Sequence, residues 1–469
     1  MDRNDIPFLT VAELGRLIRG RDVSPVEATE AYLDRIDDLD FKFNAYLTVC
    51  RREALQAARE AEREIAAGEY RGPMHGIPVG IKDQIWTRGT RTTGGSRLFR
   101  DFVPEEDATV VANLKGAGAV ILGKTNMTEL AVSPYTHRYS LPHNPWNLDA
   151  LAGGSSSGSG AGTGAFLCAT SLGEDTGGSI RRPASWCGIV GLRPSWGRVS
   201  RHGVMRGVWS MDQVGPMSRT VEDCAITLGA IAGYDPRDPY TWDAPVPDYT
   251  AALDGDVRGL KVGVISEIMT SHWLDPEVRD VVVKATAVLG ELGATVEDVS
   301  IPLVAHANTI AGTALSAETA LDQGNMIRDR LDEYGHDNTI MLLTASLIPA
   351  QAYYKAQKLR ELLRRQVHDT LERYDVLVFP TSGRTAPERL EDDRTIDSKE
   401  TAARIPFMFN NTANLASVPG ISVPCGLSPA NMPVGLQVVG KPFSEETVFK
   451  VGHAYEQATD WHTMRPPNA

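Results

Sequence analysis

From about residue 75 onward, short apolar runs alternate with longer segments in which apolar residues recur at helical spacing. The runs short enough to be strands are residues 77–81, 119–122, 168–172, 260–265, 295–299, 375–379 and 434–439. The segments with a helical pattern are residues 108–115, 275–293, 353–373 and 445–458. Strands that alternate with helices are typical of an α/β protein, so we expect a mainly parallel core sheet covered by helices.

The first 70 residues show a different pattern, which predicts helices. Thr10 with Glu13, and Ser24 with Glu27, fit capping boxes, in which paired side chains satisfy free backbone N–H groups at the start of a helix. Residues 51–67 are rich in Ala, Glu and Arg and predict a helix on the surface.

The chain has 469 residues, a length compatible with about three domains or with one large α/β domain. Residues 234–248 contain four prolines and predict a loop. This loop either separates two domains or projects from the surface of one. We favour one domain, because strand-like segments continue on both sides of the loop.

Acidic residues outnumber basic ones, with 60 Asp and Glu against 47 Lys and Arg and a formal net charge of −13. This balance argues against nucleic acid or an anionic membrane as the main partner. The N-terminus lacks the apolar segment of a signal peptide, and no run of 18 apolar residues occurs, so we expect a cytoplasmic protein. The five cysteines are far apart and odd in number, which predicts neither a disulfide framework nor a zinc site.

Residues 152–165, AGGSSSGSGAGTGA, contain no large side chain. One interpretation is a flexible linker. The other is a stretch where the backbone approaches another backbone or a substrate closely, which only small residues permit. We favour the second, because linkers seldom lie between apolar, strand-like segments with no charge nearby.

A second unusual tract, GEDTGGSIRRPA at residues 173–184, follows the strand-like run 168–172. A tight Gly-Gly turn that places Ser179 after a strand can direct several backbone N–H groups at one point. Such donors stabilise the oxyanion of a tetrahedral intermediate. Phosphate-binding loops look similar, but no nucleotide-binding fingerprint follows a suitable strand, so nucleotide binding is the weaker interpretation.

A serine nucleophile needs a base, and two kinds of base are candidates. GSSSG at residues 154–158 fits the G-x-S-x-G elbow of Ser-His-Asp hydrolases, although a tract this rich in Gly and Ser matches by chance, and no downstream histidine lies in a recognisable setting. The better candidate is Lys82, which closes the apolar run 77–81. Such a lysine either reaches water or pairs with Asp83, or is desolvated with a pKa low enough to accept a serine proton.

These tracts resemble the amidase signature family, and the likeness extends from about residue 10 to residue 465. The segments that carry it are residues 76–83, 153–156, 175–181, 187–194, 197–200, 422–424, 433–437 and 453–456. Within this family, the chain resembles glutaminase subunits of tRNA-dependent amidotransferases and stand-alone amidases. The resemblance implies a large mixed, mainly parallel central sheet, covered on both faces by helices, in one domain over residues 1–469. Its parts would be an N-terminal helical region (1–70), the catalytic motifs (71–233), a variable substrate-recognition region (234–400) and a return to the sheet with a C-terminal helix (401–469).

The family uses a Ser–cis-Ser–Lys triad and an acyl-enzyme intermediate. By motif position, the resemblance implies Ser179 as nucleophile, Ser155 as bridging serine and Lys82 as base, with a cis peptide between Gly154 and Ser155. Neutral Lys82 would take a proton from Ser155, which would take one from Ser179 as it attacks the carbonyl. The oxyanion would be held by the backbone N–H groups of Thr176, Gly177, Gly178 and Ser179. This mechanism needs no metal or cofactor.

Several residues depart from the family pattern. Ser157 stands where the family usually has glycine, and Glu174 replaces a small residue. Neither touches the three triad positions, so we expect activity to be retained. Gly160, Gly162 and Gly164 weaken the helix expected after the bridging serine, because each glycine costs about 1 kcal/mol relative to alanine.

Two further departures concern the substrate. The arginine that glutaminase subunits use for the carboxylate of glutamine is replaced within residues 336–341, and their acidic residue before residues 413–416 is replaced by Phe407 or a neighbour. Losing a guanidinium and gaining aromatic residues favours a neutral, more apolar substrate.

We therefore expect a stand-alone amidase for small neutral aryl or alkyl amides, with carbamates (urethanes) or esters as further substrates. The candidate pocket residues are Met127, Leu130, Tyr135, Trp209 and Phe407. The alternative is a glutaminase-type subunit or another partner-dependent amidohydrolase. A homo-oligomer is compatible with either.

Overall fold

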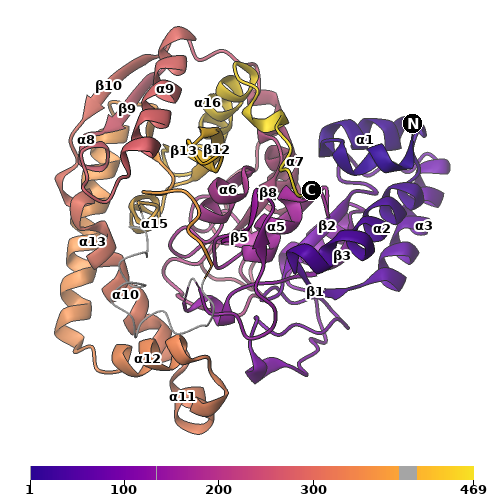
Figure 1. The fold of residues 1–469 in the computed structure, drawn as a ribbon, viewed down its shortest axis with the longest axis horizontal. Coiled ribbons are helices and arrows are strands. Elements are labelled where there is room, and N and C mark those ends of the chain that lie inside the picture. The colour runs from indigo at the N-terminus through magenta and orange to yellow at the C-terminus, as the bar shows by residue number, and fades with distance from the viewer. Residues whose placement is uncertain (1, 134, 390–408) are drawn as a thin grey trace.

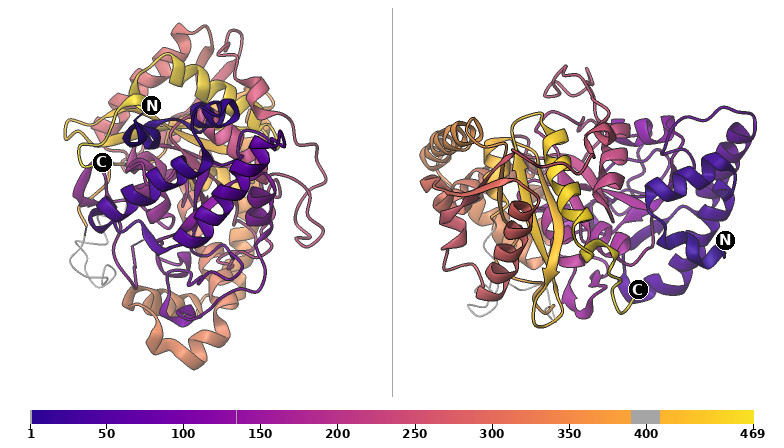
Figure 2. Two further views of the ribbon diagram at one scale, coloured as in Figure 1. Left: turned by 90° about the vertical axis from the view of Figure 1, so that its right-hand side faces the viewer. Right: turned by 90° about the horizontal axis from the view of Figure 1, so that it is seen from above.

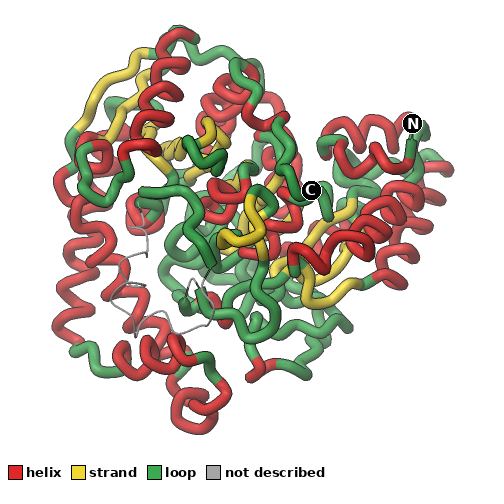
Figure 3. The backbone as a smooth tube through the Cα atoms, viewed as in Figure 1, coloured by secondary structure: helices red, strands yellow, loops and turns green. Residues whose placement is uncertain are grey.

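The computed structural model describes residues 2–133, 135–389 and 409–469, and its helices surround a long twisted sheet (Figures 1 and 3). The strands are β1 (Tyr46–Val49), β2 (Pro78–Lys82), β3 (Val120–Thr125), β4 (His143–Asn144), β5 (Asn147–Leu151), β6 (Thr170–Glu174), β7 (Val190–Arg193), β8 (Val214–Ser218), β9 (Lys261–Ile265), β10 (Thr295–Val299), β11 (Val376–Pro380), β12 (Gly420–Leu427) and β13 (Pro433–Gly440).

The helices flank the sheet. They are α1 (Val11–Gly20), α2 (Pro25–Phe43), α3 (Arg51–Ala66), α4 (Thr109–Gly116), α5 (Ser157–Gly164), α6 (Arg181–Cys187), α7 (Val221–Ile231), α8 (Ser266–Met269), α9 (Pro276–Glu291), α10 (Ala307–Asp322), α11 (Gly324–Arg330), α12 (His336–Ala345), α13 (Ala350–Leu371), α15 (Asn411–Ala416) and α16 (Glu445–Gln457). The N-terminal helices α1–α3 lie at one end of the sheet and α10–α13 at the other (Figures 1 and 2). Within the described ranges, none of these helices is both long and apolar enough to cross a membrane.

Eleven of the described strands form one sheet in the order β1-β3-β2-β6-β8-β7-β12-β13-β11-β9-β10. The prediction of a large mixed sheet is confirmed. Parallel pairs occupy two parts of it, β3-β2-β6 and β11-β9-β10. The pairs between β6 and β11, through β8, β7, β12 and β13, are antiparallel, as is the edge pair of β1 with β3.

Helices cover both faces of this sheet, as expected. On β6, Thr170 bonds Thr227 of α7, whereas the next residue, Ser171, bonds Thr163 of α5. Successive side chains of a strand point to opposite faces, so α5 and α7 lie on opposite sides. Helices also cover both faces of the sheet at β12, where α6 contacts one side of the strand and α16 contacts the other.

The predicted local elements agree with the structure. Thr10 and Ser24 both form complete capping boxes, with Glu13 and Glu27, at the starts of α1 and α2. The proline-rich residues 234–248 contain no helix or strand, as predicted for a loop.

The tract 152–165 is not a linker, because all of its residues are buried and most of it forms α5. Its glycines permit close packing: a Cβ at Gly158 would lie 2.4 Å from the backbone oxygen of Ala45 and 2.4 Å from the backbone nitrogen of Asn126. At Gly160 a Cβ would lie 2.9 Å from Cβ of Pro183 on α6. The low helix propensity of α5 is therefore offset by contacts that larger residues would prevent.

Candidate active site

Lys82 is fully buried at the end of β2, and its side chain points at the bridging serine. Its Nζ lies 2.7 Å from Oγ of Ser155, within a hydrogen bond. Asp83 does not pair with it, because the Asp83 carboxylate accepts a hydrogen bond from the backbone N–H of Thr93 at 2.9 Å. Burial lowers the pKa of Lys82 below its ordinary value, while the nearby Glu174 opposes that change.

The backbone around Ser155 is fixed on both sides. The Gly154–Ser155 peptide is cis. The carbonyl of Gly154 accepts a hydrogen bond from Nη2 of Arg182 at 2.6 Å, and the carbonyl of Ser155 accepts one from the N–H of Thr128 at 3.2 Å. These contacts hold the Ser155 hydroxyl toward Lys82.

Ser179 follows β6 in a short loop before α6 and is partly exposed, whereas its neighbours are buried. Its carbonyl accepts a hydrogen bond from the N–H of Ser156 at 3.2 Å, which places the two serine-bearing tracts side by side. Gly178 has a φ of 108°, a conformation that favours glycine. The tight turn predicted before Ser179 is therefore present.

The backbone N–H groups of this loop differ in whether they already have a hydrogen-bond partner. Gly178 N–H donates to Oδ1 of Asp175 at 2.7 Å and is thus occupied. For the N–H groups of Thr176, Gly177 and Ser179, no partner occurs among the residues that the structure describes. Three of the four proposed oxyanion donors are therefore available in this conformation.

Asp175 organises the loop from beneath. Besides Gly178, it accepts hydrogen bonds from the side chains of Arg181, at 3.0 Å, and Asn414, at 2.8 Å. Although burial alone raises its pKa, the charge and hydrogen bonds of Arg181 and the charge of Arg193 hold that pKa well below its ordinary value. Asp175 is thus a buried carboxylate that fixes the start of α6.

Two acidic residues that the motif analysis did not place in the site lie beside Lys82. Glu174 Oε2 is 3.3 Å from Lys82 Nζ, so this departure from the family pattern touches the candidate base, contrary to our assumption that it leaves the triad undisturbed. Glu174 Oε1 is 2.8 Å from the Thr176 hydroxyl, which is also 2.7 Å from Oδ1 of Asp212. Burial and the charge of Glu174 raise the pKa of Asp212 to about 7. The unusual glutamate was the only sequence signal for this cluster.

The alternative Ser-His-Asp arrangement lacks its histidine. Ser156 Oγ donates to the carbonyl of Glu174 at 3.2 Å and has no histidine partner among the described residues. His137 contacts the adjacent Ser157 at 2.9 Å, and burial lowers the pKa of His137 to about 4. Ser157 is itself buried at the start of α5.

A cleft of about 910 Å³ reaches the two acidic residues beside Lys82. Glu174 and Asp212 line it together with two of the candidate pocket residues, Leu130 and Trp209.

Two further candidates, Met127 and Tyr135, do not line this cleft. Met127 is fully buried, and Tyr135 lies near the charged groups of Arg182 and Arg384. Phe407 lies outside the described residues.

Residues 336–341, the segment in which the arginine of glutaminase subunits is replaced, begin α12. The side chain of Asn338 is buried, accepts a hydrogen bond from the N–H of Ser133 at 3.1 Å and donates to the carboxylate of Glu129 at 2.9 Å. Where α12 contacts the loop that carries Leu130, it therefore presents an uncharged amide.

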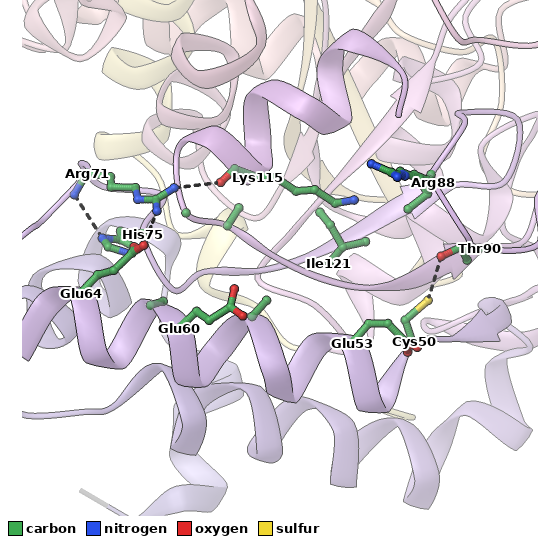
Figure 4. Close-up of a pocket in the computed structure, with 15 residues that line it drawn as sticks. Cys50, Glu53, Glu60, Glu64, Arg71, His75, Arg88, Thr90, Lys115 and Ile121 are labelled. Atoms are coloured by element: carbon green, nitrogen blue, oxygen red, sulfur yellow. Dashed lines mark hydrogen bonds and ion pairs between the residues drawn. The ribbon is translucent and has the colours of Figure 1, made fainter. Parts of the chain in front are cut away.

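A smaller hollow of about 240 Å³ lies between α3 and the end of the sheet near β3 (Figure 4). Glu64 pairs there with both Arg71 and His75, and Lys115 pairs with Asp107 at 2.8 Å. None of the triad residues lines it. The hollow is therefore separate from the candidate active site.

The arrangement of a buried lysine, a serine on a cis peptide and an N–H-rich loop agrees with what comparison of sequences shows. A sequence profile of the amidase family, described as "Amidase", matches residues 27–449. The chain belongs to this family, so the predicted family and the prediction of a hydrolase acting on carbon–nitrogen bonds are confirmed.

Among individual proteins, one of the subunits of the glutamyl-tRNA(Gln) amidotransferase from Geotalea daltonii is 42% identical, over 97% of this chain and 98% of its own length. A bacterial aryl acylamidase of the amidase signature family has a structure that superposes with a TM-score of 0.88 at 26% identity, covering 97% of this chain and 98% of the other. The peptide amidase of Stenotrophomonas maltophilia superposes with a TM-score of 0.85 at 31% identity, covering 98% of both chains.

Proposed function

We propose that the chain hydrolyses a carboxamide through an acyl-enzyme on Ser179. The observation that carries the proposal is the 2.7 Å contact of buried Lys82 with Ser155. Lys82, when neutral, takes the proton of Ser155, and Ser155 takes that of Ser179 as the latter attacks the substrate carbonyl. As the intermediate collapses, Ser155 gives one proton to the departing amine and recovers its own from Lys82, and water then releases the acyl group.

The loop after β6 supports the next step of the proposal. The oxyanion of the tetrahedral intermediate accepts hydrogen bonds from the N–H groups of Thr176, Gly177 and Ser179. These donors are already directed by the bonds of Asp175 and need no reorganisation during the reaction. Gly178 contributes by shaping the loop, because its own N–H is held by Asp175.

For the substrate, similarity favours glutamine and a partner protein. The amidotransferase protein from Geotalea daltonii is 42% identical to the chain and spans nearly all of it, and its name states that it is one subunit of a larger enzyme. We therefore place a glutaminase-type subunit first. It would release ammonia from a carboxamide for use elsewhere in a complex.

A specific observation favours a second candidate, a stand-alone amidase for neutral aryl or alkyl amides, carbamates or esters. The part of α12 that faces the Leu130 loop presents Asn338, and α12 (His336–Ala345) contains no arginine or lysine for the carboxylate of glutamine. The fold also superposes well on an aryl acylamidase, with a TM-score of 0.88.

One assay separates the two. The purified chain is incubated with glutamine, an anilide, an alkyl amide, a carbamate and an ester, beside the Ser179→Ala and Lys82→Ala variants. A folded chain that hydrolyses glutamine alone, or is inert without a partner, supports the glutaminase-type reading. Turnover of the neutral amides, lost in both variants, supports the stand-alone amidase. Turnover that persists in both variants contradicts the proposed mechanism for either.

A further inference from the structure

The three hydrogen-bonding positions around Lys82 Nζ are filled by two residues. Ser155 Oγ lies at 2.7 Å, the carbonyl of Glu174 at 3.2 Å and Oε2 of the same Glu174 at 3.3 Å. A neutral amine has two hydrogens and one lone pair. If both hydrogens go to Glu174, the lone pair faces the Ser155 hydroxyl, which is the orientation that a base requires.

Glu174 is itself part of a buried pair of acids. The Thr176 hydroxyl lies within hydrogen-bond distance of both Glu174, at 2.8 Å, and Asp212, at 2.7 Å. A hydroxyl has one hydrogen and can donate to only one of them. Satisfying both contacts therefore requires a proton on one carboxyl group, so that Glu174 and Asp212 together carry one negative charge.

We propose that Glu174 is a positioning residue that aims the lone pair of Lys82 at Ser155, and that the charge it shares with Asp212 sets the pH at which Lys82 becomes a base. This inference rests on the proposed function of Lys82. It gives a role to the one motif position where this chain places a carboxylate beside its base.

The sign of the effect follows from the charges. A carboxylate 3.3 Å from the amine stabilises the ammonium form of Lys82. The pair of acids therefore raises the pKa of Lys82, whereas burial lowers it. Asp212 acts in the same direction from further away. Three other charged residues surround the cluster. Asp175 is paired with Arg181, and Arg193 lies near Glu174 and Asp212. All of them stay unchanged in the variants below.

The test measures how fast a fluorophosphonate reacts with Ser179, since this reaction needs the base but no knowledge of the substrate. Ser179 Oγ bonds to phosphorus, fluoride leaves, and the proton passes to Ser155 and Lys82. The second-order rate is followed by intact mass spectrometry from pH 5 to 10. The proteins are the wild type, Glu174→Gln, Glu174→Ala, Asp212→Asn and the control Glu456→Gln, which changes a buried glutamate on α16.

We expect the midpoint of the rate to move to lower pH by about 1 to 3 units in Glu174→Gln, which keeps an acceptor but removes the charge. Asp212→Asn leaves the single charge of the pair on Glu174, so its midpoint does not move to lower pH. Glu174→Ala also lowers the plateau rate, on the order of tenfold to a hundredfold, because the amine loses its alignment. The control overlays the wild type.

An unmoved or raised midpoint in Glu174→Gln overturns the proposal, as does a midpoint in Asp212→Asn that moves to lower pH. If the melting temperature shows that Glu174→Gln does not fold, a midpoint in Asp212→Asn that moves to lower pH overturns it instead. A wild type that is never labelled at Ser179 overturns the proposed function itself, an outcome distinct from labelling with an unchanged pH profile.

Discussion

Lys82 has no exposed surface, and burial lowers the pKa of its amine. A base must be unprotonated to act, so we expect kcat/KM to fall as the pH drops through the pKa of Lys82. The measurement is kcat/KM on the best amide of the panel between pH 5 and 10. A profile that stays flat down to pH 5 contradicts a lysine base.

Asp175 gives a second prediction at this scale. It pairs with Arg181, and both side chains are fully buried. Asp175→Asn leaves the guanidinium without its charge partner, so we expect a loss of roughly 3 to 5 kcal/mol in the free energy of unfolding and loss of turnover. Urea unfolding of the variant beside Glu361→Gln, a partly exposed ion-pair residue of α13, checks this. Equal midpoints for the two variants speak against the role of Asp175.

The sequence motifs predicted only some of the residues that meet in the site. The contact of Lys82 with Ser155, and the cis peptide before Ser155, agree with the prediction. Glu174 and Asp212 were not predicted, because their positions depend on the pairing of β6 with β2 and β8, which brings together segments far apart in the chain. The roles of the triad stay a prediction until tested chemically.

At the scale of elements, α5 packs closely enough that its glycines are required. In Gly158→Ala the new Cβ would meet backbone atoms of Ala45 and Asn126 at 2.4 Å, and a backbone moves less readily than a side chain. We expect destabilisation of about 1 to 3 kcal/mol, measured by thermal and urea unfolding.

The matched control is Gly312→Ala on α10, where a Cβ meets no atom within 4 Å. It should stabilise the protein by up to about 1 kcal/mol through helix propensity alone. If both variants shift stability in the same direction, the packing explanation for α5 is wrong.

The strands that were predicted are continuous apolar runs, such as those that form β3, β9 and β11. Others were missed for a physical reason. β8 contains Gly215 and Pro216, which disfavour a strand in isolation, yet it is paired on both sides within the sheet. Tertiary pairing thus overrides local propensity there. The organisation of residues 1–469 as one domain stays a prediction, which the continuous sheet supports.

At the scale of the whole molecule, pH dependence of stability should reveal buried acids. Burial raises the pKa of Glu456 on α16 to about 8, while its carboxyl group accepts a hydrogen bond from the N–H of Val221 at 2.9 Å. The folded protein therefore holds this proton more tightly than the unfolded chain. The stability that Glu456 contributes is fully present below about pH 4.5 and is lost as the pH rises through about 8.

Glu456→Gln mimics the protonated form and should flatten this part of the curve. Its free energy of unfolding should exceed that of the wild type at pH 9 by on the order of 1 kcal/mol or more, with little difference at pH 5. Urea unfolding at several pH values measures both. Parallel curves for the two proteins would show that Glu456 does not titrate in this range.

We propose Ser179 as the nucleophile and Lys82 as the base that activates it through Ser155. The most direct measurement is to label the wild type, Lys82→Ala and Ser156→Ala with a fluorophosphonate and to locate the adduct by peptide mass spectrometry. We expect one adduct, on Ser179, that persists in Ser156→Ala and disappears in Lys82→Ala. An adduct on Ser156, or labelling of Ser179 that is unaffected by the loss of Lys82, would contradict it.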